Sequence, residues 1–265
     1  MGMSEFTTVN EVAPRALSLV VPAYNEANRL PSYLESVQSY FDSALGLNYE
    51  VIVVDDGSDD NTEALVREYI SDWPELRYIR HRHNSGKGSA LRTGAFSASG
   101  SILLFTDADG ATPIECEYAL RAALYGGADM ATGVRYGSDL SNSRRPVRRL
   151  LSGVFRFASR FLLETAHRDS QCGFKMMPRS TARILFSLAR EQGYLIDLEL
   201  LTLAARLGLG IAEVPVEFRD VPGSKVALVA DSWRMFVGLS RLRRDLPQRL
   251  AEIKRVGKPS KRVAW

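Results

Sequence analysis

Three short apolar runs, each ending in a polar turn, constrain the fold of this chain more than any other feature. They cover residues 16–21, 49–54 and 103–105, and segments with helical character follow the first two, at roughly 30–45 and 61–73. Strands that alternate with helices are typical of parallel βαβ units, and an uninterrupted apolar run is typical of a strand buried on both faces. We therefore expect an α/β fold with a mostly parallel central sheet flanked by helices.

The polar turns after these runs are expected to meet, because open α/β sheets bind ligands at the carboxyl ends of their strands. The turns are 22–26, 55–58 and the segment that holds Asp107, Ala108 and Asp109. Two neighbouring carboxylates repel each other unless a cation lies between them, and their oxygens suit Mg²⁺ or Mn²⁺, which also bind phosphates. The turns together predict a metal–diphosphate site, and the alternative is a solvated acidic turn.

Several motifs resemble family 2 glycosyltransferases of the GT-A fold. They are Val21-Pro22-Ala23-Tyr24-Asn25-Glu26, Val54-Asp55-Asp56-Gly57-Ser58, Asn84-Ser85-Gly86-Lys87-Gly88 and Asp107-Ala108-Asp109-Gly110. Within that family, residues 169–175 and 222–225 are similar to the dolichyl-phosphate hexosyltransferases, to the glucosyl branch first and the mannosyl branch next. The resemblance covers about 17–246 and implies a Rossmann-like GT-A domain.

We expect one catalytic domain over 16–246, preceded by a flexible leader (1–15) and followed by a basic tail (247–265). No apolar run approaches the roughly 18 residues of a membrane span. The formal net charge is only +3, and no nucleic-acid recognition motif is recognisable, so we expect no nucleic-acid partner. Cys116 and Cys172 have no metal-site spacing, and we expect Cys172 to be a buried small apolar residue.

The resemblance implies a nucleotide-sugar donor site at the first two turns. The residues at matching positions are Pro22, Tyr24, Glu26, Val54 and Asp56. Tyr24 would pack on the base or ribose. Glu26 would accept a hydrogen bond from a ribose hydroxyl, and Asp56 would accept one from the base. Asp55 and Ser58 are expected to support the second turn, with Ser58 capping the next helix.

The resemblance also implies a cationic set around the diphosphate. We assign to catalysis Asp107, Asp109, Arg135, Arg219 and Lys225, with Asp107 and Asp109 as ligands of Mg²⁺ or Mn²⁺ and with Ala108 and Lys87 as further donor contacts. For Lys87 a purely structural role is the alternative. Some mannosyl enzymes have a third metal ligand two residues after the second carboxylate. Ala111 stands there in this chain, so we expect water to complete the metal shell.

Two further groups of polar residues receive weaker assignments. His81 and His83 are two residues apart, but no third metal ligand is evident, and we expect both on the surface. Asp169 lies in the acceptor-side motif and is expected to position an arginine or lysine. Lys175, in the same motif, is expected to contact the acceptor phosphate.

Two basic segments with amphipathic patterning, 144–163 and 233–246, suggest a surface role. Such helices lie in a membrane interface in some proteins, and in others they pack against the core with a solvated basic face. The resemblance favours the membrane, because related enzymes glycosylate a lipid phosphate. We therefore expect a protein peripheral on the cytoplasmic face of a membrane.

The function implied is metal-dependent, inverting transfer of a hexose to a polyprenyl phosphate, with glucose from UDP-glucose as the expected donor. A phosphate oxygen is already anionic near neutral pH, so the reaction requires no protein base. Alternatives are a GDP-mannose donor, a saccharide acceptor and a nucleotidyltransferase. A fourth alternative, from another class, is a noncatalytic, membrane-peripheral binder of nucleotide sugars.

Overall fold

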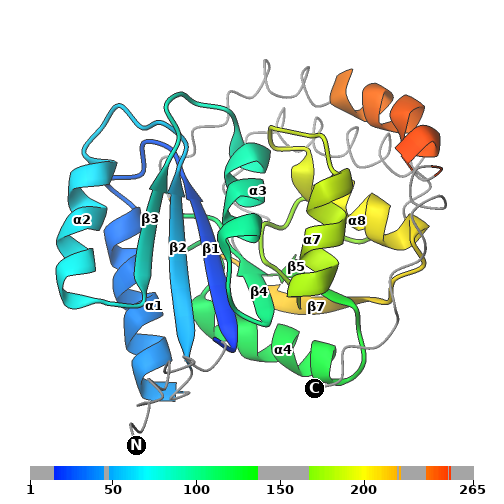
Figure 1. Cartoon of the computed structure of the whole chain (residues 1–265). Coiled ribbons are helices and arrows are strands. Elements are labelled where there is room, and N and C mark those ends of the chain that lie inside the picture. The colour runs from blue at the N-terminus through cyan, green and yellow to red at the C-terminus, as the bar shows by residue number, and fades with distance from the viewer. Residues whose placement is uncertain are drawn as a thin grey trace, which may run out of the picture.

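A seven-stranded sheet forms the centre of the computed structural model, which describes residues 15–44, 48–136, 167–219, 221, 237–249 and 251 (Figure 1). The strands are β1 Leu17–Ala23, β2 Tyr49–Asp55, β3 Leu76–Arg80, β4 Ile102–Phe105, β5 Met130–Tyr136, β6 Lys175–Pro178 and β7 Ile211–Glu217. Their order across the sheet is β3-β2-β1-β4-β6-β5-β7. Strand β6 pairs antiparallel with β4 and β5, and the other pairs are parallel, which confirms the mostly parallel sheet.

Helices cover both faces of the sheet. They are α1 Leu30–Ala44, α2 Thr62–Asp72, α3 Lys87–Ser97, α4 Glu117–Tyr125, α7 Arg179–Leu188 and α8 Ile196–Arg206, with a 3₁₀ turn, η1 Ile114–Cys116, before α4. Buried side chains of α1, α2 and α4 form one core with the sheet, and those of α3, α7 and α8 form the other. The α/β architecture is therefore the expected one.

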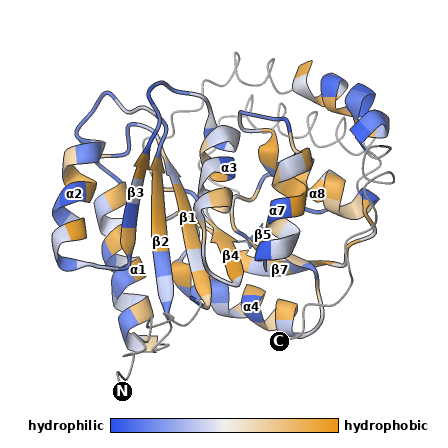
Figure 2. Cartoon of the chain, viewed as in Figure 1, coloured by the Kyte–Doolittle hydropathy of each residue, from blue (hydrophilic) through white to orange (hydrophobic). Residues whose placement is uncertain are grey.

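The apolar runs are buried because each contributes to both cores. Along β1, Leu19 and Val21 face the core under α1, whereas Val20 faces the core under α3. All seven residues of β2 are buried. In Figure 2 most of β1 and β2 carries the hydrophobic colour, with paler segments along each strand. A strand with two covered faces does not alternate in polarity, which is why these segments are apolar almost throughout. The exceptions, Ser18 and Glu50, are buried and hydrogen-bonded to each other.

A buried polar cluster closes the amino end of the sheet, opposite the site described below. The Glu50 carboxylate accepts hydrogen bonds from Ser18 Oγ (2.7 Å), from Ser99 N and Oγ (2.7 Å each) and from Arg77 Nη1 (2.5 Å). Burial by itself would raise the pKa of Glu50, but these hydrogen bonds outweigh it and lower the pKa to about 2. Glu50 therefore joins β1, β2, β3 and the turn before β4 as an ionised group.

The C-terminal helix over 237–249 contradicts part of the membrane prediction. Leu239, Leu242 and Leu246 of its apolar stripe are buried in the protein, whereas Val237 of the same stripe is exposed and Trp233 and Phe236 lie outside the described residues. Arg249 is also buried and pairs with Glu199 of α8. These three leucines are therefore not available for insertion into lipid, whereas Arg241, Arg243 and Arg244 are exposed on the outer side of the helix.

The other basic segment, 144–163, lies outside the described residues. No helix in the described part of the chain combines the length and the apolar character needed to cross a bilayer.

Candidate active site

The three polar turns lie together at the carboxyl edge of the sheet, as the sequence predicted. The turn after β2 is joined to β1 by a hydrogen bond from Asp56 N to Ala23 O (2.8 Å). The Asn25 amide donates to Ser58 Oγ (2.8 Å), and Ser58 N donates to Asp55 Oδ1 (2.7 Å). Asp55 thus supports the turn as expected. Ser58 is also structural, but the prediction that it caps α2 is wrong, because its hydroxyl holds the β1 turn and the cap position of α2 belongs to another residue.

Asp107 and Asp109 follow β4, and each carboxylate lies beside a cation. Lys87 Nζ, at the start of α3, lies 2.6 Å from Asp107 Oδ1. Arg29 Nη1 lies 3.5 Å from Asp109 Oδ2. Burial and the negative charge of Asp107 together raise the pKa of Asp109. Two carboxylates one residue apart are thus held at the sheet edge by compensating positive charge.

A glycine makes room for the Asp107 carboxylate. A Cβ atom at Gly173 would lie 2.6 Å from Asp107 Cγ and 2.7 Å from Oδ1, closer than side chains pack. The loop before β6 therefore presses against the carboxylate. Glycine at position 173 is what allows Asp107 to occupy this position.

The donor set at this edge fits Mg²⁺ or Mn²⁺ bound together with phosphate. Asp107 and Asp109 supply hard carboxylate oxygens, and their side chains are 45% and 27% exposed, so a ligand can reach them. The described residues contain no group of three or more His, Cys, Asp or Glu side chains arranged to hold a metal. Mg²⁺ commonly takes one or two carboxylates and completes its shell with substrate phosphates and water, which suits this pair.

Arg135, at the end of β5, is held by Asp169, which confirms the positioning role expected for that carboxylate. The guanidinium donates from Nε to Asp169 Oδ2 (2.6 Å) and from Nη2 to Oδ1 (2.9 Å), and it also stacks 5.2 Å from the Phe218 ring centre. Burial would raise the pKa of Asp169, but the Arg135 hydrogen bonds lower it. Asp169 takes the Nε–Nη2 edge of the guanidinium and so fixes its orientation. The remaining N–H groups of Arg135 can donate to a phosphate, which arginine binds through two hydrogen bonds.

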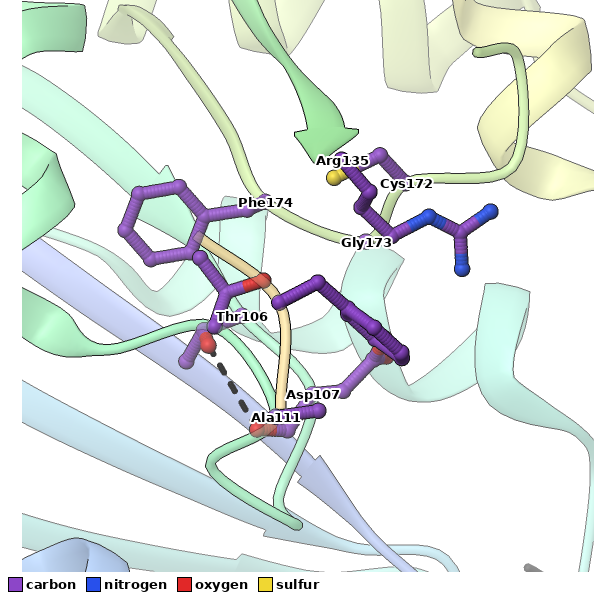
Figure 3. Close-up of a pocket in the computed structure, with 9 residues that line it drawn as sticks. Thr106, Asp107, Ala111, Arg135, Cys172, Gly173 and Phe174 are labelled. Carbon is purple, nitrogen blue, oxygen red and sulfur yellow. Dashed lines mark hydrogen bonds between the residues drawn. The ribbon is translucent and has the colours of Figure 1, made fainter. Parts of the chain in front are cut away.

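A pocket lies between these groups (Figure 3). It is lined by Thr106, Asp107, Ala111, Thr112, Arg135, Cys172, Gly173, Phe174 and Phe218. The close-up shows that Cys172, Gly173 and Phe174 come from the loop before β6, opposite Thr106 and Asp107 after β4. Cys172 is buried, as expected, and its apolar surroundings raise the pKa of the thiol to about 11. The pocket thus joins Asp107, one of the two predicted metal ligands, to the Arg135 side of the site.

Lys175 does not reach the acceptor side, and this prediction is wrong. Its side chain is 1% exposed, and its ammonium donates to Asp197 Oδ1 (2.7 Å) and to the Cys172 carbonyl. Asp197, on α8, also accepts from Lys87 Nζ (2.9 Å). The sequence reasoning missed Asp197. Its signal was a single carboxylate in the otherwise apolar run 195–198.

Asp56 is held by the loop that precedes α3. Its Oδ1 accepts from His81 Nδ1 (2.7 Å) and Ser85 N (2.9 Å), and its Oδ2 accepts from Gly86 N (2.6 Å). His81 Nε2 lies 2.9 Å from Thr93 Oγ1, so His81 is a partly exposed residue that also supports Asp56, a contact the sequence did not predict. His83 is exposed, as expected.

Other donor-side residues lie where the turns place them. Glu26 accepts from Arg29 Nε at 2.7 Å, so it orients the arginine that faces Asp109. Pro22 and Tyr24 are partly exposed at the end of β1 and remain predicted nucleotide contacts. The Val54 side chain is fully buried in the core, so any contact with a base would come from its backbone.

Arg219 lies at the rim of the site, whereas Lys225 lies outside the described residues. The Arg219 backbone N–H donates to Ala111 O (2.8 Å), which joins the end of β7 to the turn after β4. Its exposed guanidinium pairs with Glu217 (2.9 Å). Its assignment to the diphosphate therefore stays a prediction.

Comparison with known proteins shows the family to which this chain belongs. Residues 18–186 match the model described as "Glycosyl transferase family 2". The dolichyl-phosphate beta-glucosyltransferase of Trichomonas vaginalis is 34% identical over 233 residues, which are 84% of this chain and 72% of the relative. The human protein of the same name is 36% identical over 226 residues, 80% of this chain and 70% of the relative.

Solved glycosyltransferase structures resemble this fold. Glucosyl-3-phosphoglycerate synthase from Mycobacterium tuberculosis in complex with UDP has a TM-score of 0.65 and 26% identity, covering 86% of this chain and 80% of that one. The same enzyme in complex with Mn²⁺, UDP-glucose and phosphoglyceric acid has a TM-score of 0.64, 25% identity and the same two coverages.

Proposed function

Because the chain belongs to glycosyltransferase family 2, we propose that it transfers glucose from UDP-glucose to the phosphate of dolichol or of another polyprenol. The observation that carries the proposal is that Asp107 and Arg135 line one pocket, with Asp109 in the same turn as Asp107 and with Asp169 holding the Arg135 guanidinium. This arrangement offers a place for a metal-bound diphosphate on one side and a fixed cation for a second phosphate on the other. The names of the relatives support the glucosyl donor and the lipid phosphate acceptor.

In this proposal Asp107 and Asp109 hold a divalent cation against the donor diphosphate. The cation would act as a Lewis acid that stabilises the departing UDP. Lys87 and Arg29 lie beside the two carboxylates and supply further positive charge at the same place. Negative charge that develops on the leaving group therefore meets cations that protein carboxylates already hold at the site.

On the acceptor side, Arg135, which the family resemblance assigned to the donor diphosphate, would instead orient the lipid phosphate. Asp169 holds its guanidinium through two hydrogen bonds, so the cation does not have to be ordered when the acceptor binds. One acceptor oxygen attacks the anomeric carbon as the bond from that carbon to the UDP oxygen breaks, with inversion. The attacking oxygen is already anionic, and no proton has to be removed from it.

The lipid acceptor also implies work at a membrane surface, on its cytoplasmic face. The exposed cations Arg241, Arg243 and Arg244 support this, since such side chains attract anionic lipid headgroups. The burial of Leu239, Leu242 and Leu246 in the same helix favours attraction by charge over insertion of these leucines into lipid.

The test is transfer from a panel of radiolabelled nucleotide sugars, with Mg²⁺ or Mn²⁺, to dolichyl phosphate, followed by analysis of the lipid fraction. We expect label in the lipid from UDP-glucose and release of UDP. Asp107→Asn is the inactive control, and 3-phosphoglycerate, the substrate type named for the structural neighbours, is the competing acceptor. Label that enters phosphoglycerate but not lipid, or comes from GDP-mannose alone, would overturn the substrate assignment.

A further inference from the structure

An unbroken chain of ion pairs runs from the metal carboxylates into the core. It begins at Asp107, passes through Lys87 Nζ (2.6 Å) to Asp197 (2.9 Å) and ends at Lys175 (2.7 Å). Its members come from four separate parts of the chain: the turn after β4, α3, α8 and β6. Charges alternate along it, so each group is compensated by its neighbours.

The inner half of this chain fixes the outer half. The side chains of Lys175 and Asp197 are 1% and 5% exposed, and neither can change its partner without leaving a buried charge unpaired. Lys87 is 13% exposed and lies at the boundary, with one partner in the core and one in the site. Its ammonium can therefore shift on the site side while it stays bound to Asp197.

The second metal carboxylate is compensated too. Asp109 faces Arg29, whose guanidinium is anchored by Glu26. A divalent cation approaching without a donor would therefore meet two carboxylates whose charge is already offset and an ammonium in contact with one of them. A diphosphate brings negative charge for Lys87 and for the metal at once.

We infer that Lys87, anchored by Asp197, is the resident counter-cation of Asp107 and makes metal binding depend on the donor diphosphate. The inference deepens the proposed function and rests on its metal–diphosphate site. Lys87 opposes a lone divalent ion by repulsion and by occupying an oxygen of Asp107. When a diphosphate binds, Lys87 transfers its contact to a phosphate oxygen and frees the carboxylate. Metal and donor then raise each other's affinity, since coupling between two ligands is reciprocal.

The experiment measures Mn²⁺ affinity by electron paramagnetic resonance, with and without UDP. Lys87→Met keeps the aliphatic stem and removes the charge, so we expect it to bind Mn²⁺ alone at least about tenfold more tightly than the wild type, with a smaller effect of UDP. Asp197→Asn leaves Lys87 and Lys175 without a shared anion, so we expect weaker Mn²⁺ binding without UDP. Lys87→Arg keeps the charge and is the matched control, expected near the wild type.

The two opposite signs separate an electrostatic role from a structural one. Loss of structure would weaken Mn²⁺ binding in both variants, and circular dichroism checks the fold of each. Unchanged or weaker binding of Mn²⁺ alone by folded Lys87→Met would overturn the inference. Should Lys87→Met fail to fold, Asp197→Asn decides, and unchanged or tighter binding there would overturn it.

Glucose transfer by the wild type keeps this result distinct from the proposed function. If the wild type glucosylates dolichyl phosphate but Lys87→Met binds Mn²⁺ no more tightly, the inferred role of Lys87 is rejected and the proposed function is retained. If the Mn²⁺ affinities of the variants change as expected but the wild type transfers no glucose, the inferred role of Lys87 is retained and the substrate assignment is rejected.

Discussion

Replacing Gly173 by alanine should move a metal carboxylate without changing any charged residue. The added Cβ would lie 2.6 Å from Asp107 Cγ and closer still to Oδ2, whereas ordinary contact begins at 3.4 Å, so the carboxylate must retreat by about 1 Å. A misplacement of about 1 Å at a reacting centre can cost about a hundredfold in rate. We therefore expect kcat/KM for glucose transfer to fall by roughly a hundredfold in Gly173→Ala, or about 2.7 kcal/mol of transition-state stabilisation.

The assay is transfer of glucose from UDP-glucose to dolichyl phosphate at saturating Mn²⁺, read together with thermal unfolding. Gly210→Ala is the matched control, because its added Cβ would lie at ordinary distance, 3.5 Å, from Asp129 Oδ2, at the far end of the sheet. We expect that control to keep nearly full activity. In an Asp107→Ala background, Gly173→Ala should add little further loss, since both changes act on the same carboxylate.

Nearly normal kcat/KM in Gly173→Ala with an unchanged melting temperature would refute the reasoning. It would mean that the position of the Asp107 carboxylate does not limit the reaction. A large loss of activity together with a large fall in melting temperature would instead assign the effect to the fold. The comparison of activity with unfolding therefore decides between the two.

Three other predictions follow from the same structure. Asp109→Ala should lower glucose transfer by about a hundredfold or more with little change in melting temperature, because a partly exposed turn carboxylate supports no core. Glu50→Gln should cost about 2 kcal/mol of unfolding free energy at pH 7 in urea denaturation. Because the pKa of Glu50 is lowered from its ordinary value of 4.5 to about 2, its ionisation stabilises the fold at pH values above 4.5, and this contribution is lost as the pH falls toward 2. Glu50→Gln should therefore flatten the fall in stability at acid pH, and an unchanged fall would contradict this. Replacing Arg241, Arg243 and Arg244 by glutamine should weaken flotation with anionic vesicles at low salt, and equal flotation would argue against a membrane role for this face.

Several features of this protein could be read from neighbouring residues alone. The strand before Asp107 is apolar throughout because it is covered on both faces, and that property is written in consecutive residues. The polar turns follow the strands directly, and the parallel arrangement then brings them to one edge. The core of the site, Asp107 and Asp109 beside the β1 and β2 turns, was predictable for this reason.

The partners of the charged residues could not be read in the same way. Lys87 and Asp197 are 110 positions apart, and Arg135 and Asp169 are 34 apart. An ion pair depends on the distance between two side chains in space, and nothing local in the sequence records it. Lys175 was misplaced for the same reason, since a charged side chain is exposed or buried according to what the rest of the chain packs around it.

The C-terminal helix separates what the sequence determines from what only the tertiary structure decides. Its sequence determined the amphipathic pattern of Leu239, Leu242 and Leu246 beside exposed arginines, because helical periodicity fixes which residues share a face. Only the tertiary structure decided what covers that face, and here it is the protein's own core. The sequence thus determined the strands, the turns and the paired carboxylates. The long-range packing decided which cations compensate those carboxylates, because burial and charge pairing are properties of the assembled fold.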